Sequence, residues 1–151
     1  MSEKLTFDSI NVGDEMTPYV RKYTQEMVNV IMDVIGSVPN WHVDPDQAKN
    51  VSDWDIKEDS TALPGVMTEM GVSEFMVNWL GSPLPWYGGG GLNIKLIAPV
   101  QIHVKDGGEI TYKGKVTGKK EEDGKKIVEC DIYGEHGGGK VMVGTARAVF
   151  S

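Results

Sequence analysis

One segment, residues 63–81, limits what this chain can fold into more than any other part of the sequence. It reads LPGVMTEMGVSEFMVNWLG, and as a helix it would be apolar around most of its circumference. A helix that is apolar nearly all round is buried, whereas a surface helix has a single apolar stripe. Pro64 suits a first helical turn, and Gly81 with Pro83 and Pro85 behind it is a typical end. We therefore predict a buried central helix that the rest of the chain covers.

Two glycines lie within this helix, Gly65 and Gly71. Glycine has no Cβ atom, so another backbone or a ligand can approach closely, although each glycine costs a helix about 1 kcal/mol relative to alanine. We predict that Gly71 faces a sheet at a close crossing. For Gly65 the sequence leaves two readings open, a packing contact and a contact with a ligand.

Length and charge exclude several classes of protein. The chain has 151 residues, which suits one domain over residues 1–151, and 22 acidic against 15 basic residues give a formal net charge of -7. That balance argues against nucleic-acid partners and anionic membranes, which both need a basic face. No apolar run is long enough for a signal peptide or a membrane span, and Cys130 is the only cysteine. We expect a cytoplasmic protein without a disulfide, metal or cofactor.

Before the central helix, the sequence predicts two shorter helices. Thr24 is a typical N-cap, apolar residues follow it at helical spacing, and Gly36 ends the pattern. Asp44 begins a second, short helix. We read residues 7–18 as an extended entry segment with a turn, and residues 51–62 as a loop or flap.

After the central helix, the pattern changes to strands. Residues 92–104 are strand-like, with Pro99 suggesting a bulge or an edge. Asp123-Gly124 is a typical hairpin turn between two of the strands that follow. These further alternating segments lie at residues 107–122, 125–135 and 141–150. The order of elements predicts an α+β fold, in which one antiparallel sheet curls around the central helix.

A second motif lies between the two shorter helices, in the sequence GSVPNWHVDPDQA of residues 36–48. It resembles the MaoC-like dehydratases and (R)-specific enoyl-CoA hydratases of the hot-dog superfamily, whose typical signature runs roughly Gly-Asp-x-Asn-Pro-x-His-x-Asp. The chain matches that signature at Gly36, His42 and Asp44, at Ala48 beyond it, and in reversed order at Pro39-Asn40. Residues 68–81 also resemble the small subunits of heteromeric hydratases that act on steroid side-chain enoyl-CoA. The resemblance implies a hot-dog fold, in which a five-stranded antiparallel sheet wraps around one long helix.

The resemblance also implies a site. His42 falls where the family has its catalytic histidine, and it would act as the general base, since imidazole titrates near neutral pH. Ser37 stands where the family has a catalytic aspartate, so it would only position water. Asp44 is two residues from His42 and could orient it. The remaining candidates are substrate-binding residues: Gly65, whose N–H would hold the thioester carbonyl, Ser73 and Asn40.

Other readings of these residues stay open. His42 could merely cap or bridge the short helix that follows it, and the Ser73 hydroxyl could bond to the backbone of its own helix. A carboxylate elsewhere could replace the aspartate that the family has. The candidates for that replacement are Asp33, Asp53, Asp55, Glu58 and Asp59.

Three classes of function follow from the resemblance. The first is a hydratase or dehydratase of acyl-CoA thioesters, active alone or as part of a heteromer. The second is a thioesterase or a lyase acting on CoA esters, and the third is a non-catalytic hot-dog subunit. An open sheet edge invites pairing with another chain, so we expect a homodimer or a heteromer with another hot-dog subunit, with an acyl-CoA thioester as the small-molecule partner.

Overall fold

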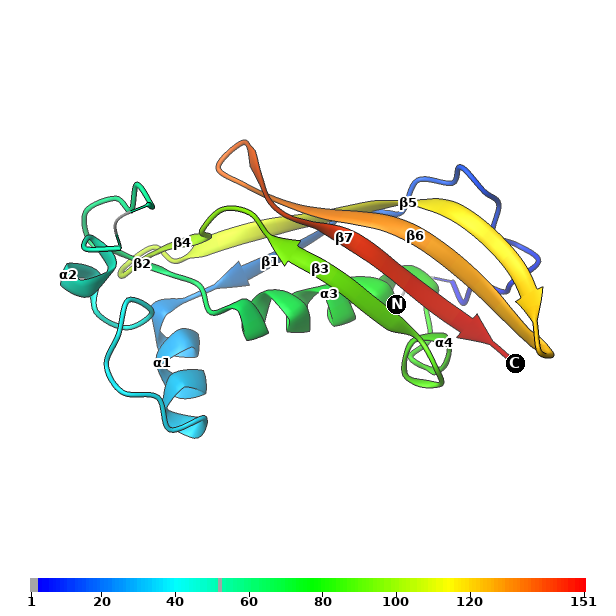
Figure 1. Ribbon diagram of the computed structural model, residues 1–151, viewed down its shortest axis with the longest axis horizontal. Coiled ribbons are helices and arrows are strands. Elements are labelled where there is room, and N and C mark those ends of the chain that lie inside the picture. The colour runs from blue at the N-terminus through cyan, green and yellow to red at the C-terminus, as the bar shows by residue number, and fades with distance from the viewer. Residues whose placement is uncertain (1–2, 52) are drawn as a thin grey trace.

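The computed structural model describes residues 3–51 and 53–151 (Figure 1). A five-stranded antiparallel sheet, in the order β1-β5-β6-β7-β3, curves around one long helix, α3 (Gly65–Leu80). A second sheet joins β2 to β4. The predicted α+β class, with an antiparallel sheet around a central helix, is confirmed. The other elements are β1 (Tyr19–Tyr23), α1 (Gln25–Val34), α2 (Pro45–Ala48), β2 (Ser60–Ala62), α4 (Leu84–Tyr87), β3 (Gly91–Leu96), β4 (Gln101–His103), β5 (Gly108–Glu122), β6 (Lys125–His136) and β7 (Gly139–Phe150).

The central helix has one buried face and one open flank. Pro64 precedes its first residue, and Gly81 ends it in the left-handed conformation at φ 63°. Its buried side chains are Met67, Thr68, Val72, Phe75, Met76, Trp79 and Leu80. Val66 and Met70 are 44% and 50% exposed, so the expectation that the helix is buried nearly all round is wrong along this flank. The sheet covers only one side of the helix, and none of the described helices is long and apolar enough to cross a membrane.

Gly71 lies at a close crossing of α3 with the sheet, as predicted. A Cβ atom there would overlap the Tyr112 hydroxyl of β5 and lie 2.5 Å from the Tyr23 hydroxyl of β1. Both hydroxyls bond to the helix backbone: Tyr23 Oη donates to the Met67 carbonyl at 3.0 Å, and Tyr112 Oη donates to the Thr68 carbonyl at 3.1 Å. Two buried tyrosines therefore fix the height of the helix beneath the sheet.

The three alternating segments predicted after residue 106 form β5, β6 and β7, which pair in sequence order as antiparallel hairpins. Asp123 and Gly124, in the turn between β5 and β6, have φ values of 51° and 73°. Positive φ at both central residues is what a type I′ hairpin turn requires. The turn could therefore be predicted from sequence, because Asp-Gly is one of the few residue pairs that readily adopt positive φ at both positions.

Other elements differ from the expectation. The predicted strand at residues 92–104 is divided at Pro99, which has no N–H to donate to a ladder: β3 pairs with β7, whereas β4 pairs with β2. Residues 60–62, expected to belong to a loop, form the strand β2. The first strand, β1, and the short helix α4 were not predicted, although β1 supplies the fifth strand by pairing with β5.

Candidate active site

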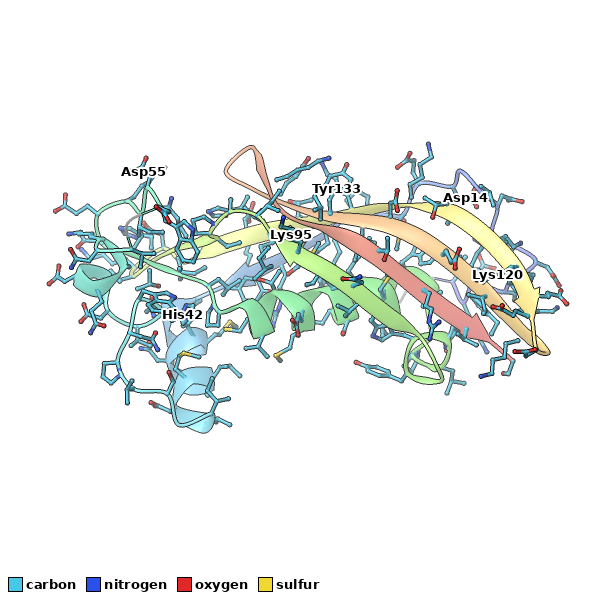
Figure 2. All side chains as sticks on the ribbon, in the orientation of Figure 1. Asp14, His42, Asp55, Lys95, Lys120 and Tyr133 are labelled. Carbon is cyan, nitrogen blue, oxygen red and sulfur yellow. The ribbon has the colours of Figure 1, made fainter. Side chains whose placement is uncertain are left out.

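His42 is fixed against β2 by its own ring and by the backbone of the residue before it. The Ala62 N–H donates to the Trp41 carbonyl at 3.1 Å, and the Ala62 carbonyl lies 2.6 Å from Nδ1 of His42. Figure 2 shows His42 at the end of the molecule that carries α1, α2 and β2. A three-residue strand thus holds the turn that contains the histidine.

The contact with Ala62 selects one tautomer of the His42 ring. A carbonyl oxygen can only accept a hydrogen bond, so Nδ1 must carry the proton that is donated to Ala62. A neutral imidazole has a single N–H, which leaves Nε2 with a free lone pair. The arrangement therefore presents Nε2 as a proton acceptor, which is the form that a general base needs.

Burial changes the acidity of His42 in the same direction. The ring is half-buried, and loss of water around its charged form lowers the pKa of His42 below the ordinary value of 6.5. The hydrogen bond to the Ala62 carbonyl acts the other way and only partly offsets this effect. His42 is consequently neutral at neutral pH.

Asn40 and Ser37 organise the turn around His42. The Asn40 side chain accepts a hydrogen bond from the His42 N–H at 2.8 Å, and its amide group donates to the Ser37 hydroxyl at 2.8 Å and to the Val38 carbonyl at 2.9 Å. Both polar atoms of the Asn40 amide are thus engaged inside the turn. Ser37 lies beside Asn40 and makes no hydrogen bond to the ring of His42.

Asp44 is the N-cap of α2. Its carboxylate accepts from the backbone N–H of Asp46 at 2.9 Å and from the side chain of Gln47 at 3.1 Å. The Ala62 carbonyl, rather than Asp44, orients the His42 ring. Within residues 3–51 and 53–151, no carboxylate is hydrogen-bonded or ion-paired to His42. This holds for all five carboxylates that could have replaced the aspartate of the family, namely Asp33, Asp53, Asp55, Glu58 and Asp59.

The start of α3 lies close in sequence to Ala62, whose carbonyl contacts the His42 ring. Gly65, the first helical residue, follows Ala62 by three positions. The first N–H groups of a helix have no partner within the helix, and they carry its positive dipole end. A Cβ atom at Gly65 would lie 2.9 Å from the Leu96 side chain, so the absence of a side chain lets Leu96 pack closely against this end of the helix.

An apolar hollow of about 120 Å³ lies beside the beginning of α3 and beside Ala62, the residue whose carbonyl contacts His42. It is smaller than the several hundred Å³ of pockets that enclose a whole drug-sized ligand. Its lining comes from Trp54, Ala62, Leu63, Thr68, Leu96, Ile97, Ala98, Pro99, Val100 and Val141. Of the residues that hold His42, Ala62 is the one that this hollow shares.

Ser73 lines a different hollow. It is half-buried on the open flank of α3, where Met70, Val77 and Tyr87 share with it a hollow of about 390 Å³. At 1.5 Å of rise per residue, Ser73 is about 12 Å further along the helix than Gly65. Ser73 therefore lines a hollow that is separate from the start of α3 and from the Ala62 carbonyl.

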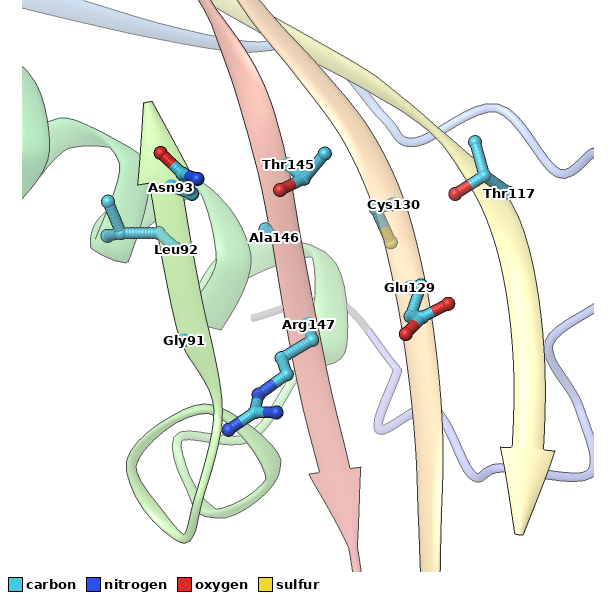
Figure 3. A pocket seen from close by; sticks show the side chains of 9 residues that line it. All are labelled: Gly91, Leu92, Asn93, Thr117, Glu129, Cys130, Thr145, Ala146 and Arg147. Carbon is cyan, nitrogen blue, oxygen red and sulfur yellow. The ribbon is translucent and has the colours of Figure 1, made fainter. Parts of the chain in front are cut away.

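A third hollow, of about 520 Å³, lies on the outer face of the main sheet (Figure 3). Figure 3 shows Thr117 on β5, Glu129 on β6 and Arg147 on β7 reaching onto this face, and all three side chains are exposed. It contains no histidine, and nothing connects it with His42. In the described part of the chain, no group of three or more His, Cys, Asp or Glu residues is placed to hold a metal ion.

Three contributors to the site were missed by reasoning from sequence. The Ala62 carbonyl is a backbone group, and the side chains of Gln25 and Thr61 lie far from His42 in the sequence. A three-residue strand is too short for an alternating pattern, so β2 gave no signal of its own. Tertiary contacts of β2 and of α1 bring these groups to the histidine turn.

Comparison with known proteins identifies the fold. Neither a protein-family model nor the sequence of a curated protein matches this chain. Among solved structures, it is similar to a MaoC-like dehydratase, with 22% identity and a TM-score of 0.77 over 98% of this chain and 43% of the other. It thus spans less than half of that chain's length.

Two further structures match along nearly their whole length. The (R)-hydratase from A. caviae involved in PHA biosynthesis has 18% identity and a TM-score of 0.67, over 93% of this chain and 96% of the other. The ChsH1–ChsH2 complex from Mycobacterium tuberculosis has 15% identity and a TM-score of 0.65, over 93% and 98%. This chain has the hot-dog fold, as the resemblance of its sequence implied.

Proposed function

We propose that this hot-dog chain adds water to enoyl-CoA thioesters, or removes it from 3-hydroxyacyl-CoA thioesters, with His42 as the general base. The observation that carries the proposal is the 2.6 Å contact between Nδ1 of His42 and the Ala62 carbonyl, because it leaves Nε2 free to take a proton. The fold supports the same general activity, since several similar structures are hydratases or dehydratases by name. CoA as the carrier of the acyl group is part of the proposal.

The chemistry needs three roles to be filled: a base for water, hydrogen-bond donors for the thioester oxygen and an acid for the α-carbon. In the hydration direction, Nε2 of His42 takes a proton from water, and the water oxygen bonds to the β-carbon of the conjugated thioester. The double-bond electrons move toward the thioester oxygen, where the free N–H groups at the start of α3, including that of Gly65, stabilise the developing negative charge. The protonated His42 ring then gives its proton to the α-carbon, so one imidazole serves first as the base and then as the acid.

The experiment for this proposal is a hydration assay on purified protein. A set of enoyl-CoA thioesters with acyl groups of increasing size is offered, and loss of the conjugated double bond is followed. Each thioester is assayed with the chain alone and with candidate partner subunits. Hydration of at least one thioester by the chain alone, or by a complex whose activity is lost in His42→Ala, supports the proposal, and inertness under every condition contradicts it.

A second function is favoured by one observation, the missing carboxylate. Ser37 stands where the related enzymes have aspartate, and no carboxylate in the described chain contacts His42. A non-catalytic hot-dog subunit needs no such group. A chain that is inert alone, and that makes a partner subunit active even when it carries His42→Ala, would establish this second function in place of the first.

Restoring the carboxylate is expected to leave activity intact or raise it. In Ser37→Asp, the Asn40 amide that now donates to the serine hydroxyl would donate to the new carboxylate. A carboxylate in this turn offers water a second proton acceptor. The kcat/KM of Ser37→Asp is compared with that of Ser37→Asn, which has the same shape without the charge. A lower value for Ser37→Asp than for Ser37→Asn would contradict the expectation.

The acid limb of the pH profile is expected below pH 6.5. His42 accepts a proton only when it is neutral, and its lowered pKa keeps it neutral to a lower pH than an ordinary histidine. The value of kcat/KM should be level around neutrality and fall as the pH drops through the pKa of His42. Initial rates between about pH 5 and 8 measure this limb. A midpoint above 6.5 would assign the limb to another group.

A dimer or a dimer-based heteromer is expected in solution. β1 and β3 are the edge strands of the main sheet, and the flank of α3 at Val66 and Met70 is open. Open edges pair readily with another chain. Light scattering at micromolar concentration should give at least twice the 16.5 kDa of one chain, whereas a clean monomer would contradict this expectation.

A further inference from the structure

We infer that Gln25 and Thr61 are positioning residues for His42, which act by holding its backbone carbonyl. The inference rests on the proposed function for its meaning in catalysis, and on the hydrogen bonds of these two side chains for its geometry. Neither residue touches the free Nε2 atom of His42. Both act through the turn that carries the ring.

Gln25 joins the histidine turn to β2. It is the first residue of α1, and its side-chain amide donates to the His42 carbonyl at 2.9 Å. Its oxygen accepts a hydrogen bond from the Thr61 hydroxyl at 2.7 Å. Thr61 is completely buried, so its hydroxyl cannot hydrogen-bond to bulk water in place of Gln25. One side chain therefore links α1, β2 and the histidine turn.

The order of donors and acceptors in this link is fixed. The His42 carbonyl can only accept, so the Gln25 nitrogen must face it and the Gln25 oxygen must face Thr61. The Thr61 hydroxyl donates to that oxygen and thereby holds the amide in this orientation. If the amide turned over, two oxygen acceptors would face each other at the His42 carbonyl.

Two neighbouring residues of β2 thus hold His42 from two directions. Ala62 bonds to the ring through its carbonyl, and Thr61 holds the main chain of His42 through Gln25. The ring can keep its contact with Ala62 only while the main chain of the turn stays in place. Loss of the Gln25 link should therefore loosen the bond at Nδ1 and with it the preference for one tautomer.

Four variants separate this role from a general effect on folding. Gln25→Met and Thr61→Val keep the size of the side chain and remove the hydrogen bonds, whereas Thr61→Ser keeps the hydroxyl and serves as the conservative replacement. Asn29→Ala is the matched control, because the Asn29 side chain accepts from the same Gln25 amide at 3.0 Å on the exposed side. Thermal unfolding of each variant shows that it is folded.

The decisive readout is the tautomer and pKa of His42, from nitrogen NMR of the imidazole rings. The chain has three histidines, and the spectrum of His42→Ala identifies the signal. Gln25→Met and Thr61→Val should raise the share of the Nε2–H tautomer, whereas Thr61→Ser and Asn29→Ala should match the parent. Folded Gln25→Met protein with the parent's tautomer would overturn the inference, as would an equal change in Asn29→Ala.

Kinetics give the second readout. A misplaced base slows the chemical step more than binding, so kcat should fall about tenfold in Gln25→Met with KM nearly unchanged. The two proposals fail separately. If the parent hydrates no thioester, the tautomer still decides the role of Gln25. If the parent is active and the tautomer does not change, the positioning role fails and the proposed function stands.

Discussion

His42→Ala is expected to lower kcat/KM for enoyl-CoA hydration by at least about 100-fold, the usual cost of losing a general base. The reason lies in the geometry: Nδ1 is bonded to the Ala62 carbonyl, so Nε2 is the ring atom left to take a proton from water. Initial rates at neutral pH with the best thioester from the assay measure the effect. Most of it should appear in kcat, because the lost group acts on the reacting atoms.

His103→Ala is the matched control. His103 lies in β4 and bonds locally to Asp106, so its loss removes an imidazole away from the proposed chemistry. Its kcat/KM should stay close to that of the parent. Activity that survives His42→Ala would refute the proposed mechanism whatever the fold, and an equal loss in both variants would point to damage of the structure.

Gly71→Leu should destabilise the fold by several kcal/mol, at or above the roughly 1–3 kcal/mol typical of overpacked cores. Even the Cβ atom of the new side chain would overlap the Tyr112 hydroxyl. To make room, the two tyrosines must give up their hydrogen bonds to the carbonyls of Met67 and Thr68, which would then be buried without these partners. Urea unfolding of variant and parent measures the difference.

Val66→Leu is the control for this substitution. Val66 is on the same helix, but it is 44% exposed, so the one added methylene group meets no packed core of this chain. Its free energy of unfolding should stay within about 0.5 kcal/mol of the parent. If Gly71→Leu unfolds like the parent, the helix must sit differently beneath the sheet.

The parts of the fold that the sequence predicted are those with strong local signals. The central helix is a long, mostly apolar segment that ends at Gly81. The turn at Asp123-Gly124 needs positive φ at both residues. The cap at Thr24 also gave a correct start for α1. Each of these signals acts within a few residues, so one sequence is enough to read it.

The parts that failed depend on partners far along the chain. β1 is short and becomes a strand by pairing with β5, and β2 has three residues whose ladder is with β4. The open flank of α3 could not be foreseen either, because an apolar side chain gives the same pattern whether this sheet or another chain covers it. Local propensity carries none of this information.

For the candidate site, the sequence motif identified the histidine but not the groups that orient its ring. His42 was identified through the resemblance, whereas its orientation comes from a backbone carbonyl that no residue type announces. Asp44, two residues away, suggested itself as the orienting group, and the structure uses it to cap α2. Proximity in sequence favoured the wrong neighbour.

The pairing of β2 with β4 also separates the support of the histidine from the main sheet. β2 and β4 form a two-stranded sheet of their own, and their ladder joins only Ser60–Ala62 to Gln101–His103. A two-stranded ribbon this short is only marginally stable by itself, and a protein can open locally while the rest of its fold stays intact. Opening of β2 would therefore release the carbonyl that holds His42, and the five-stranded sheet around α3 could stay folded while the histidine loses its orientation.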